Sequence, residues 1–300
     1  MKQQLHKPIN GNPNDYAGIE LSVRHLPNTY SKTVSVVVPH FQGRVLLERC
    51  LFGLTIQSYP PHLMEVVISD DGSPSALFGV EQMFRGALNL RAITHERDGY
   101  RLATVRNRGI LASEGEVIVC LDCDIIPVPE LVESHMRWFH VSRDKATIGP
   151  RKFIDANDIR PSDVPYLIHE LRRRPDIPSA SNRFMAEDKR WPELQNFKAH
   201  PHPYNCFHGC NIAFRKGSAL AIGLFDEEFN GRCGYEDIEF GHRLYRAGHY
   251  LAFEPQALAL HQENTVISAE RRATDGEVNR RKLYTKVPEL ERYRREMGGH

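Results

Sequence analysis

The sequence lacks an apolar run long enough to span a bilayer, and its N-terminus does not have the features of a signal peptide. The first residues, MKQQLHKPINGNPNDY, are polar and interrupted by proline and glycine. Neither sign of charge is in large excess, because the sequence has 39 Lys and Arg residues and 38 Asp and Glu residues. No strong field therefore attracts nucleic acid. We expect a cytoplasmic protein that binds no nucleic acid.

A G-x-G-x-x-G motif is absent after the first β-branched run, Thr33–Pro39, which excludes a dinucleotide-dependent oxidoreductase. Cysteines are few, yet Cys120 and Cys123 form a C-x-x-C and Cys206 and Cys210 a C-x-x-x-C. Residues three apart on a strand point to opposite faces, so the first pair suits one metal ion only if the strand ends between them. We expect reduced, packed thiols, with a zinc site as the alternative.

Strand patterns alternate with helix patterns along the first half of the chain. Short β-branched or apolar runs predict strands, and apolar residues at helical spacing predict helices. The predicted strands are Thr33–Pro39, Met64–Ser69, Leu90–His95 and Glu116–Leu121, and the predicted helices are Arg44–Ser58, Arg101–Ser113 and Glu130–Val141. This alternation predicts an α/β fold with a mostly parallel sheet, whose ligands bind at the carboxyl ends of the strands.

The remaining segments differ in character. We expect residues 1–31 to form an irregular arm and residues 32–265 to form one domain. Within it, residues 155–202 are rich in Pro, Arg and Asp with weak periodicity, typical of a surface insertion or lid. Residues 266–300 read as an amphipathic helical tail, either solvated or, as the alternative, in peripheral contact with a membrane.

The strand Glu116–Leu121 runs directly into two carboxylates, Asp122 and Asp124. One acid of such a pair can coordinate a hard divalent cation while the other holds the ligand or a metal-bound water. The alternative is that two acids simply solvate the end of a strand. Asp70 and Asp71 end another predicted strand, where carboxylates can accept from a base N–H or a ribose hydroxyl.

Three further features accompany the acidic pairs. Arg101 and Arg106, on one predicted helix, can donate to a nucleotide. Glu236 and Asp237 begin another predicted helix after a Gly-Arg-Cys-Gly turn, where acids are also favoured by the helix dipole alone. His261 ends an apolar strand. Each feature has a structural alternative, but their joint occurrence in this order favours a functional site.

Six segments resemble, in order, the motifs of family 2 glycosyltransferases with the GT-A fold. They are TVSVVVPHFQG, QSYPPHLMEVVISDDGS, RLATVRNRG, LDCD, GCNIAFRK and GYEDIEFGHRLYRAG, and they span Thr33 to His261. The block with Glu236 and Asp237 is also similar to bacterial polysaccharide synthases and to animal galactosyl- and N-acetylgalactosaminyltransferases. Residues 155–202 resemble nothing in this pattern.

The resemblance implies a Rossmann-like sheet flanked by helices, a nucleotide-sugar donor (a UDP-sugar by preference) and a Mn²⁺ or Mg²⁺ ion. It assigns Asp71 and Arg101 to the nucleobase, with Pro39 in the wall beside them. Asp122 would contact ribose or a metal-bound water, and Asp124 and His261 would ligate the metal. The resemblance adds further donor-side residues: Asp70, Arg106 and Cys123.

On the acceptor side, the resemblance makes Asp237 the catalytic base, beside Glu236, and places Gly209, Asn211 and Tyr235 in the sugar and acceptor pocket. Retaining relatives carry asparagine at the position of Asp237, so its carboxylate favours an inverting mechanism. The acceptor stays unidentified: a saccharide, a peptide or a small molecule. Two other functions stay open, a sugar nucleotidyltransferase and a non-catalytic nucleotide-sugar-binding module.

Overall fold

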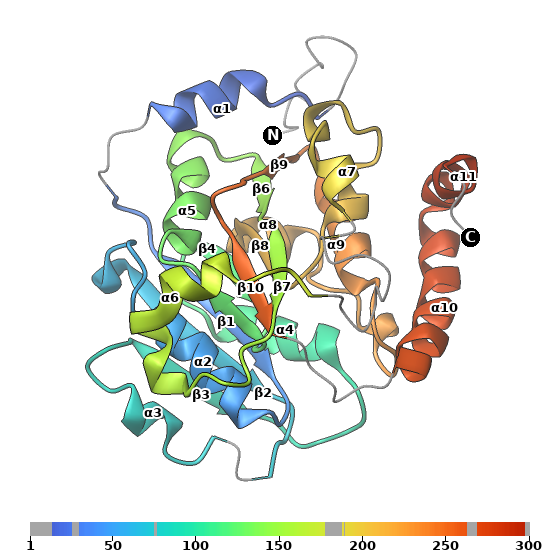
Figure 1. Cartoon of the computed structure of the whole chain (residues 1–300). Coiled ribbons are helices and arrows are strands. Elements are labelled where there is room, and N and C mark those ends of the chain that lie inside the picture. The colour runs from blue at the N-terminus through green and yellow to red at the C-terminus, as the bar shows by residue number, and fades with distance from the viewer. Residues whose placement is uncertain are drawn as a thin grey trace.

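A mostly parallel sheet runs through the middle of the molecule. The computed structural model describes residues 14–25, 30–74, 77–177, 188, 190–262 and 269–297. The sheet has the order β3-β2-β1-β4-β8-β6-β9 (Figure 1). Its strands are β1 (Val34–His40), β2 (Met64–Asp70), β3 (Leu90–Thr94), β4 (Val117–Leu121), β6 (Lys145–Ile148), β8 (Asn211–Arg215) and β9 (Tyr250–Phe253). Only β8 runs antiparallel to its neighbours, β4 and β6, so the predicted α/β class is confirmed.

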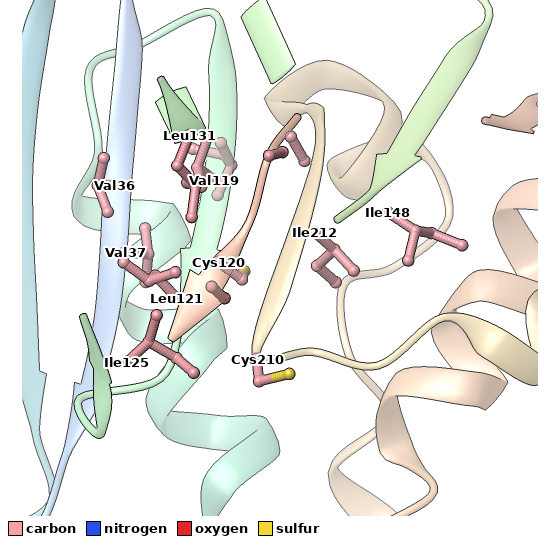
Figure 2. Close-up of a cluster of buried hydrophobic side chains, with 14 of the residues drawn as sticks. Val36, Val37, Val119, Cys120, Leu121, Ile125, Leu131, Ile148, Cys210 and Ile212 are labelled. Carbon is pink, nitrogen blue, oxygen red and sulfur yellow. The ribbon is translucent and has the colours of Figure 1, made fainter. Parts of the chain in front are cut away.

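The core forms around the buried strands β1 and β4. Every residue of β1 is buried, which explains its continuous β-branched run. Side chains of four strands meet here, among them Val37, Leu121, Ile125 and Ile212 (Figure 2). A Cβ atom at Gly109 would lie 2.5 Å from Cγ1 of Val37, so glycine lets the helix after β3 pack closely on β1.

A second, smaller sheet brings distant segments together. It has the order β5-β10-β7, with β5 (Ile125–Pro127), β10 (Ala259–Gln262) and β7 (Arg151–Ile154). β10 pairs antiparallel with β5, which places His261 opposite Ile125, and parallel with β7. The backbone N–H of Gln262 also donates to the carbonyl of Asp124 (2.8 Å). The end of β10 is therefore fixed beside the acids that follow β4.

Helices cover the sheets and differ in places from the predictions. They are α1 (Ala17–Arg24), α2 (Arg44–Leu54), α3 (Val80–Met83), α4 (Leu102–Ala112), α5 (Leu131–Val141), α6 (Val164–Arg173), α7 (Trp191–Leu194), α8 (Lys216–Ala221), α9 (Glu236–Arg246), α10 (Ala269–Lys286) and α11 (Pro288–Glu296). The arm is not irregular throughout, because α1 packs on α5. α2 ends four residues earlier than predicted, at Leu54 rather than Ser58. The apolar run that ends at His261 is two strands, β9 and β10, in different sheets.

The insertion, residues 155–202, is more ordered than its weak periodicity predicts. In α6 the buried residues Val164, Ile168 and Leu171 have helical spacing, and the helix packs on α2. The buried Arg49 donates to the carbonyl of Ile159 (2.7 Å) and so ties the insertion to α2. The segment 178–187 of the insertion, which contains Phe184, lies outside the described residues.

The described part of the tail, residues 269–297, packs on the domain instead of standing in solvent. Leu283, Val287 and Leu290 are fully buried, and α10 contacts α9. Figure 1 shows α10 and α11 along one side of the molecule, next to α9. Among the described residues, no helix combines the length and apolar character needed to cross a bilayer.

Candidate active site

The predicted acidic pairs meet at one edge of the sheet. β1, β2 and β4 are parallel neighbours, so their carboxyl ends lie side by side. Pro39 is buried at the end of β1, opposite Ser69 of β2. Asp71 follows β2, and Asp122 to Asp124 follow β4. This edge of an open α/β sheet is where ligands bind.

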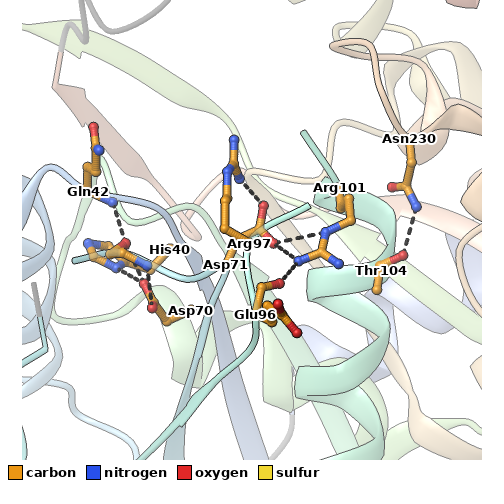
Figure 3. A network of polar contacts seen from close by, with 10 residues as sticks. His40, Gln42, Asp70, Asp71, Glu96, Arg97, Arg101, Thr104 and Asn230 are labelled. Carbon is orange, nitrogen blue, oxygen red and sulfur yellow. Dashed lines mark hydrogen bonds and ion pairs between the residues drawn. The ribbon is translucent and has the colours of Figure 1, made fainter. Parts of the chain in front are cut away.

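Asp71 is held between two arginines (Figure 3). Arg101, directly before α4, donates to the Asp71 carboxylate through Nη2 (2.8 Å) and Nε (3.2 Å). Arg97 forms a further ion pair with Asp71, and its guanidinium carbon lies 3.7 Å from the centroid of the Phe41 ring. Sequence analysis missed Arg97, although its place in a charged loop after β3 was a signal.

A pocket opens next to these arginines. Its volume is about 700 Å³, within the range of small-molecule sites, and it is lined by the loop 94–98 with Arg101 and Arg108. Burial lowers the pKa of His95, and the nearby Arg108 lowers it further. The pocket therefore carries three arginines beside two acids, Glu96 and Asp98, so it is polar with a small excess of positive charge and can accept a polar heterocycle or an anion.

Asp70 does not face this pocket, which corrects its assignment as a donor-binding residue. It is fully buried, and Nδ1 of the buried His40 lies 2.8 Å from its Oδ1. Ser73 donates its backbone N–H (2.9 Å) and its hydroxyl (2.6 Å) to the same carboxylate. Burial raises the pKa of Asp70, but these hydrogen bonds outweigh it and hold the pKa below the usual value. Asp70 fixes the turn that presents Asp71.

Asp124 and His261 face each other at one end of the small sheet, where β10 pairs with β5. His261 Nε2 lies 3.7 Å from the Asp124 carboxylate, too far for a hydrogen bond. The Nδ1 atom of His261 lies 2.9 Å from the carbonyl oxygen of Gln262, which can only accept. The proton of the neutral ring is therefore on Nδ1, and Nε2 presents a lone pair toward Asp124. Two ligands of one ion with bonds of about 2.1 Å lie roughly 3–4 Å apart, so the pair fits a divalent cation.

Arg106 connects the two acidic motifs from a buried position. Its Nη2 donates to Asp122 (2.8 Å) and its Nη1 to Glu236 (2.6 Å). The sequence predicted that Arg106 donates directly to a nucleotide, but only 1% of Arg106 is exposed and its guanidinium is paired with these two carboxylates. A Cβ atom at Gly209 would lie only 2.6 Å from Cζ of Arg106, so a residue larger than glycine would collide with the guanidinium.

Glu236 and Asp237, at the start of α9, have different surroundings. Glu236 is buried against Arg106, and burial together with the neighbouring Asp237 raises its pKa to about 7, although the guanidinium opposes this shift. Asp237 is partly exposed and accepts the backbone N–H groups of Gly209 and Ile238, both at 2.8 Å. The preceding Tyr235 has the left-handed φ of 75°. Asp237 is the more accessible of the two acids.

Asn211 is not part of a sugar pocket, which corrects its assignment. It is fully buried in β8, its Nδ2 donates to the carbonyls of Pro150 (3.1 Å) and Ala257 (2.7 Å), and its Oδ1 lies 2.9 Å from His135 Nε2. These bonds join β8 to two loops. Cys123 lies between the two acids, and burial raises the pKa of its thiol well above the usual value.

The cysteines are packed thiols, as predicted. None of the six forms a disulfide, and four of them are buried. Among the described residues, Glu193, His200 and Cys206 have the composition of a metal site. However, the N–H of His202 donates to Nδ1 of His200 (2.9 Å), so Nε2 carries the ring proton and donates to Glu193 (2.5 Å). This cluster is hydrogen-bonded and offers no imidazole lone pair to an ion.

Comparison with known families decides the classification. The model described as glycosyl transferase family 2 matches residues 35–219. The chain belongs to this family. The matched range includes both acidic pairs and Arg106, whereas Asp237 and His261 lie beyond it. The predicted family is therefore confirmed, and with it the class of enzyme.

The family 2 chain is similar to several polysaccharide synthases. It is 32% identical over 243 residues to chondroitin synthase of Pasteurella multocida (strain Pm70), covering 77% of this chain and 25% of that protein. To hyaluronan synthase of Pasteurella multocida it is 29% identical over 277 residues, covering 87% of this chain and 28% of that protein. The chain thus spans about a quarter of the length of these relatives.

Two solved structures support the fold. S. aureus TarS 1-349 in complex with UDP-GlcNAc has a TM-score of 0.57 at 15% identity, covering 79% of this chain and 60% of that one. The mannosyltransferase PcManGT from Pyrobaculum calidifontis in complex with GDP-Man and Mn²⁺ has a TM-score of 0.53 at 20% identity, covering 84% and 65%. At these identities the likeness concerns the fold alone, and the predicted GT-A fold is confirmed.

Proposed function

We propose that this family 2 chain is a metal-dependent, inverting glycosyltransferase that transfers a sugar from a UDP-sugar to an acceptor. One observation carries the proposal: Asp124 and His261 face each other at 3.7 Å, in the same site as the Arg106 bridge from Asp122 to Glu236. The arrangement joins a cation site to a carboxylate pair. In a direct displacement, the cation would stabilise the diphosphate that leaves, and a carboxylate would accept the proton of the attacking hydroxyl.

On the donor side, Asp71, Arg97 and Arg101 would bind the nucleoside beside Pro39. The partly exposed Asp122 would hold ribose or a metal-bound water. Asp124 and His261 would hold Mn²⁺ or Mg²⁺, which when bound neutralises charge on the diphosphate leaving group. UDP is favoured because TarS, a structural neighbour, is solved with UDP-GlcNAc, although PcManGT is solved with GDP-Man.

On the acceptor side, Asp237 would remove the proton from the attacking hydroxyl. It is the accessible acid, and two backbone N–H groups orient its carboxylate. Glu236 would instead hold Arg106 in place from its buried position. A base that acts opposite the leaving group produces inversion at the anomeric carbon, whereas the asparagine of retaining relatives cannot accept a proton.

The acceptor is unidentified, and a surface for it is suggested by the insertion. Tyr166 on α6 is 85% exposed and Trp191 on α7 is 39% exposed, which is unusual for such large side chains. Aromatic groups among charges suit recognition of a saccharide or peptide. We propose that residues 155–202 contact the acceptor. The cytoplasmic location expected from the sequence stays a prediction.

The test is a screen of nucleotide sugars with Mn²⁺, with the Asp124→Asn variant as control. The expected product is a nucleoside diphosphate, released with or without an added acceptor. Release of pyrophosphate from a nucleoside triphosphate would identify a nucleotidyltransferase instead. Tight binding of a nucleotide sugar without turnover of any donor or acceptor would support a non-catalytic module.

A further inference from the structure

The loop that leads to the two acids of α9 has an unusual backbone. Residues 229–235 connect a short turn (Glu227–Phe229) to α9, and within them Gly231, Gly234 and Tyr235 have φ values of 84°, 91° and 75°. For Tyr235 this left-handed conformation costs about 1 kcal/mol or more, so the surroundings must impose it. Because Glu236 and Asp237 follow at once, the loop determines where their carboxylates lie.

One side chain of the tail lies in the middle of this loop. Asn279 of α10 is fully buried, and its Nδ2 donates to the carbonyl oxygens of Phe229 (3.1 Å), Arg232 (3.2 Å) and Gly234 (2.9 Å). The nitrogen carries two N–H groups, so one of them is shared between two of these carbonyls, and this arrangement fixes the orientation of the carboxamide. Within the part of the chain that the structure describes, its own oxygen has no hydrogen-bond partner. A buried acceptor left without a donor costs about 1–3 kcal/mol, which indicates that the donors are what this position requires.

Other residues hold the same loop. Asp275 of α10 pairs with Arg232 (3.0 Å), and the guanidinium of Arg294 in α11 lies 5.6 Å from the Tyr235 ring centroid. From the domain side, the N–H of Gly231 donates to the carbonyl of Tyr100 (2.6 Å), and Asn230 donates to Thr104 (2.7 Å; Figure 3). The loop is thus clamped between the segment 100–104 and the tail.

We propose that Asn279 is a positioning residue for Glu236 and Asp237, so that the tail helices form part of the catalytic unit. The inference rests on the proposed function, in which Asp237 acts on the acceptor. The three hydrogen bonds of Asn279 fix the carbonyls of the loop, the loop fixes the first turn of α9, and that turn fixes the base. Without them, the carboxylate of Asp237 moves away from its place beside Gly209.

Two variants at this position and one control test the proposal. Asn279→Leu removes the donors at similar volume, and Asn279→Ser keeps a single, shorter donor. Arg281→Ala is the control, because Arg281 is on the same helix, is largely exposed and pairs with Glu277 of that helix. A displacement of about 1 Å can lower turnover roughly 100-fold, so we expect kcat to fall about 10–100-fold in Asn279→Leu and less in Asn279→Ser.

The affinity for UDP, measured by calorimetry, should change far less than kcat in all variants, because Asn279 bonds to Phe229, Arg232 and Gly234 and to none of the residues proposed to bind the nucleoside. Hydrogen exchange should accelerate at residues 229–237 in Asn279→Leu and not in Arg281→Ala. A merely structural role would instead lower kcat only in proportion to the unfolded fraction, and this would overturn the proposal. The proposal would also be overturned if both Asn279→Ser and Asn279→Leu kept the kcat of the wild type.

Failure of the proposed function has a different signature. In that case the wild-type protein turns over no nucleotide sugar, while the exchange measurement still reports on the clamp. If residues 229–237 then exchange equally in wild type and Asn279→Leu, Asn279 does not position the loop. Should Asn279→Leu not fold, Asn279→Ser alone decides by the same two measurements.

Discussion

The donor side and the base side of the site are built differently. On the donor side, Asp71 pairs with Arg97 and Arg101, and all three come from loops that directly follow neighbouring strands. On the base side, Arg106 and Glu236 come from distant parts of the chain and are almost fully buried. Partly exposed pairs can exchange a partner for a ligand, whereas buried pairs leave an unpaired charge when one member is removed.

This difference predicts that substitutions on one side change nucleotide affinity, whereas substitutions on the other side change turnover. Changes on the donor side should mainly alter binding of the nucleotide, because Arg97 and Arg101 line a pocket. Changes on the base side should mainly alter turnover and stability, because its groups hold one another. Each prediction below tests one side against the other, in decreasing order of expected effect.

Removal of the metal should have the largest effect. Chelation by EDTA is expected to reduce transfer to background, and Mn²⁺ should restore it better than other ions because the ligand set mixes oxygen and nitrogen. Asp124→Ala should be inactive yet folded, as judged by circular dichroism. Full activity in EDTA would exclude the metal role. If His261→Ala keeps its response to Mn²⁺, only the histidine ligand is misassigned.

The next largest effect is expected from Asp237→Asn. Loss of a positioned base should lower kcat on the order of 10²–10⁴-fold, because the acceptor hydroxyl then has no proton acceptor. The affinity for UDP should not change, since Asp237 lies on the base side. The anomeric configuration of the product, determined by NMR, should be inverted relative to the donor. Retention, or a variant with near-normal kcat, would remove Asp237 from the mechanism.

The neighbours Asp70 and Asp71 form a matched pair of carboxylates with different expected effects. Asp71→Asn should weaken UDP binding by about 1–3 kcal/mol, measured by calorimetry, because its arginines lose their charged partner. Asp70→Asn should instead lower the free energy of unfolding, since its bonds to His40 and Ser73 are structural. The reverse outcome would show that Asp70 is the residue that contacts the nucleotide.

Gly209→Ala tests the packing of Gly209 against the Arg106 guanidinium, next to the proposed base Asp237. The new methyl group would displace the Arg106 guanidinium from Glu236, so we expect the unfolding free energy to fall by about 1–3 kcal/mol and kcat to fall with it. Gly217→Ala is the matched control, because a Cβ at Gly217 meets nothing within 4 Å. Equal stability of the two variants in urea would contradict this packing.

The smallest effect concerns pH and stability. Burial lowers the pKa of His135, on the side of α5 that packs against the sheet, to about 4, so stability is lost as the pH falls from about 6.5 to 4. Burial raises the pKa of Glu236 to about 7, so its contribution changes in the opposite sense and stability is lost as the pH rises from about 4.5 to 7. The two slopes offset in the wild type.

Glu236→Gln removes one of these slopes while keeping an acceptor for Arg106. The variant should therefore lose stability on acidification more steeply than the wild type, by at most about 3 kcal/mol between pH 6.5 and 4. Urea unfolding at several pH values measures the difference. Parallel curves for the two proteins would mean that Glu236 does not titrate in this range.

The same contrast explains how much the sequence could predict. A strand pattern followed by charged residues indicates an edge of a sheet, so the locations of Asp71, Asp124 and Arg101 were predictable from local pattern. His261 was assigned to the metal by family resemblance alone, because its place beside Asp124 depends on a sheet formed with β10. Arg97 was missed because a charged loop alone does not indicate which side chain turns toward the site.

For other residues of the site, the sequence could not predict how deeply the side chain is buried or which residues it contacts. Asp70, Arg106 and Asn211 have residue types that suit ligand binding, but their neighbours come from other segments of the chain. A single glycine at 209 admits the Arg106 guanidinium, and no local pattern predicts that contact. Likewise, the helical spacing of α6 was obscured by its many charges. The sequence indicated which residue types suit ligand binding or catalysis. Contacts between distant segments determine which of these residues reach the site.

The pairing of β10 with β5 has a consequence for how the enzyme is made. The nucleoside-binding groups are complete once the first 124 residues are available, whereas His261 reaches Asp124 only after β10 joins β5 and β7. Synthesis proceeds from the N-terminus at about 5–20 residues per second, and contacts between distant segments form late. Under the proposed function, the ion site would therefore be completed later in folding than the nucleoside site. Ion affinity would then report that folding is complete.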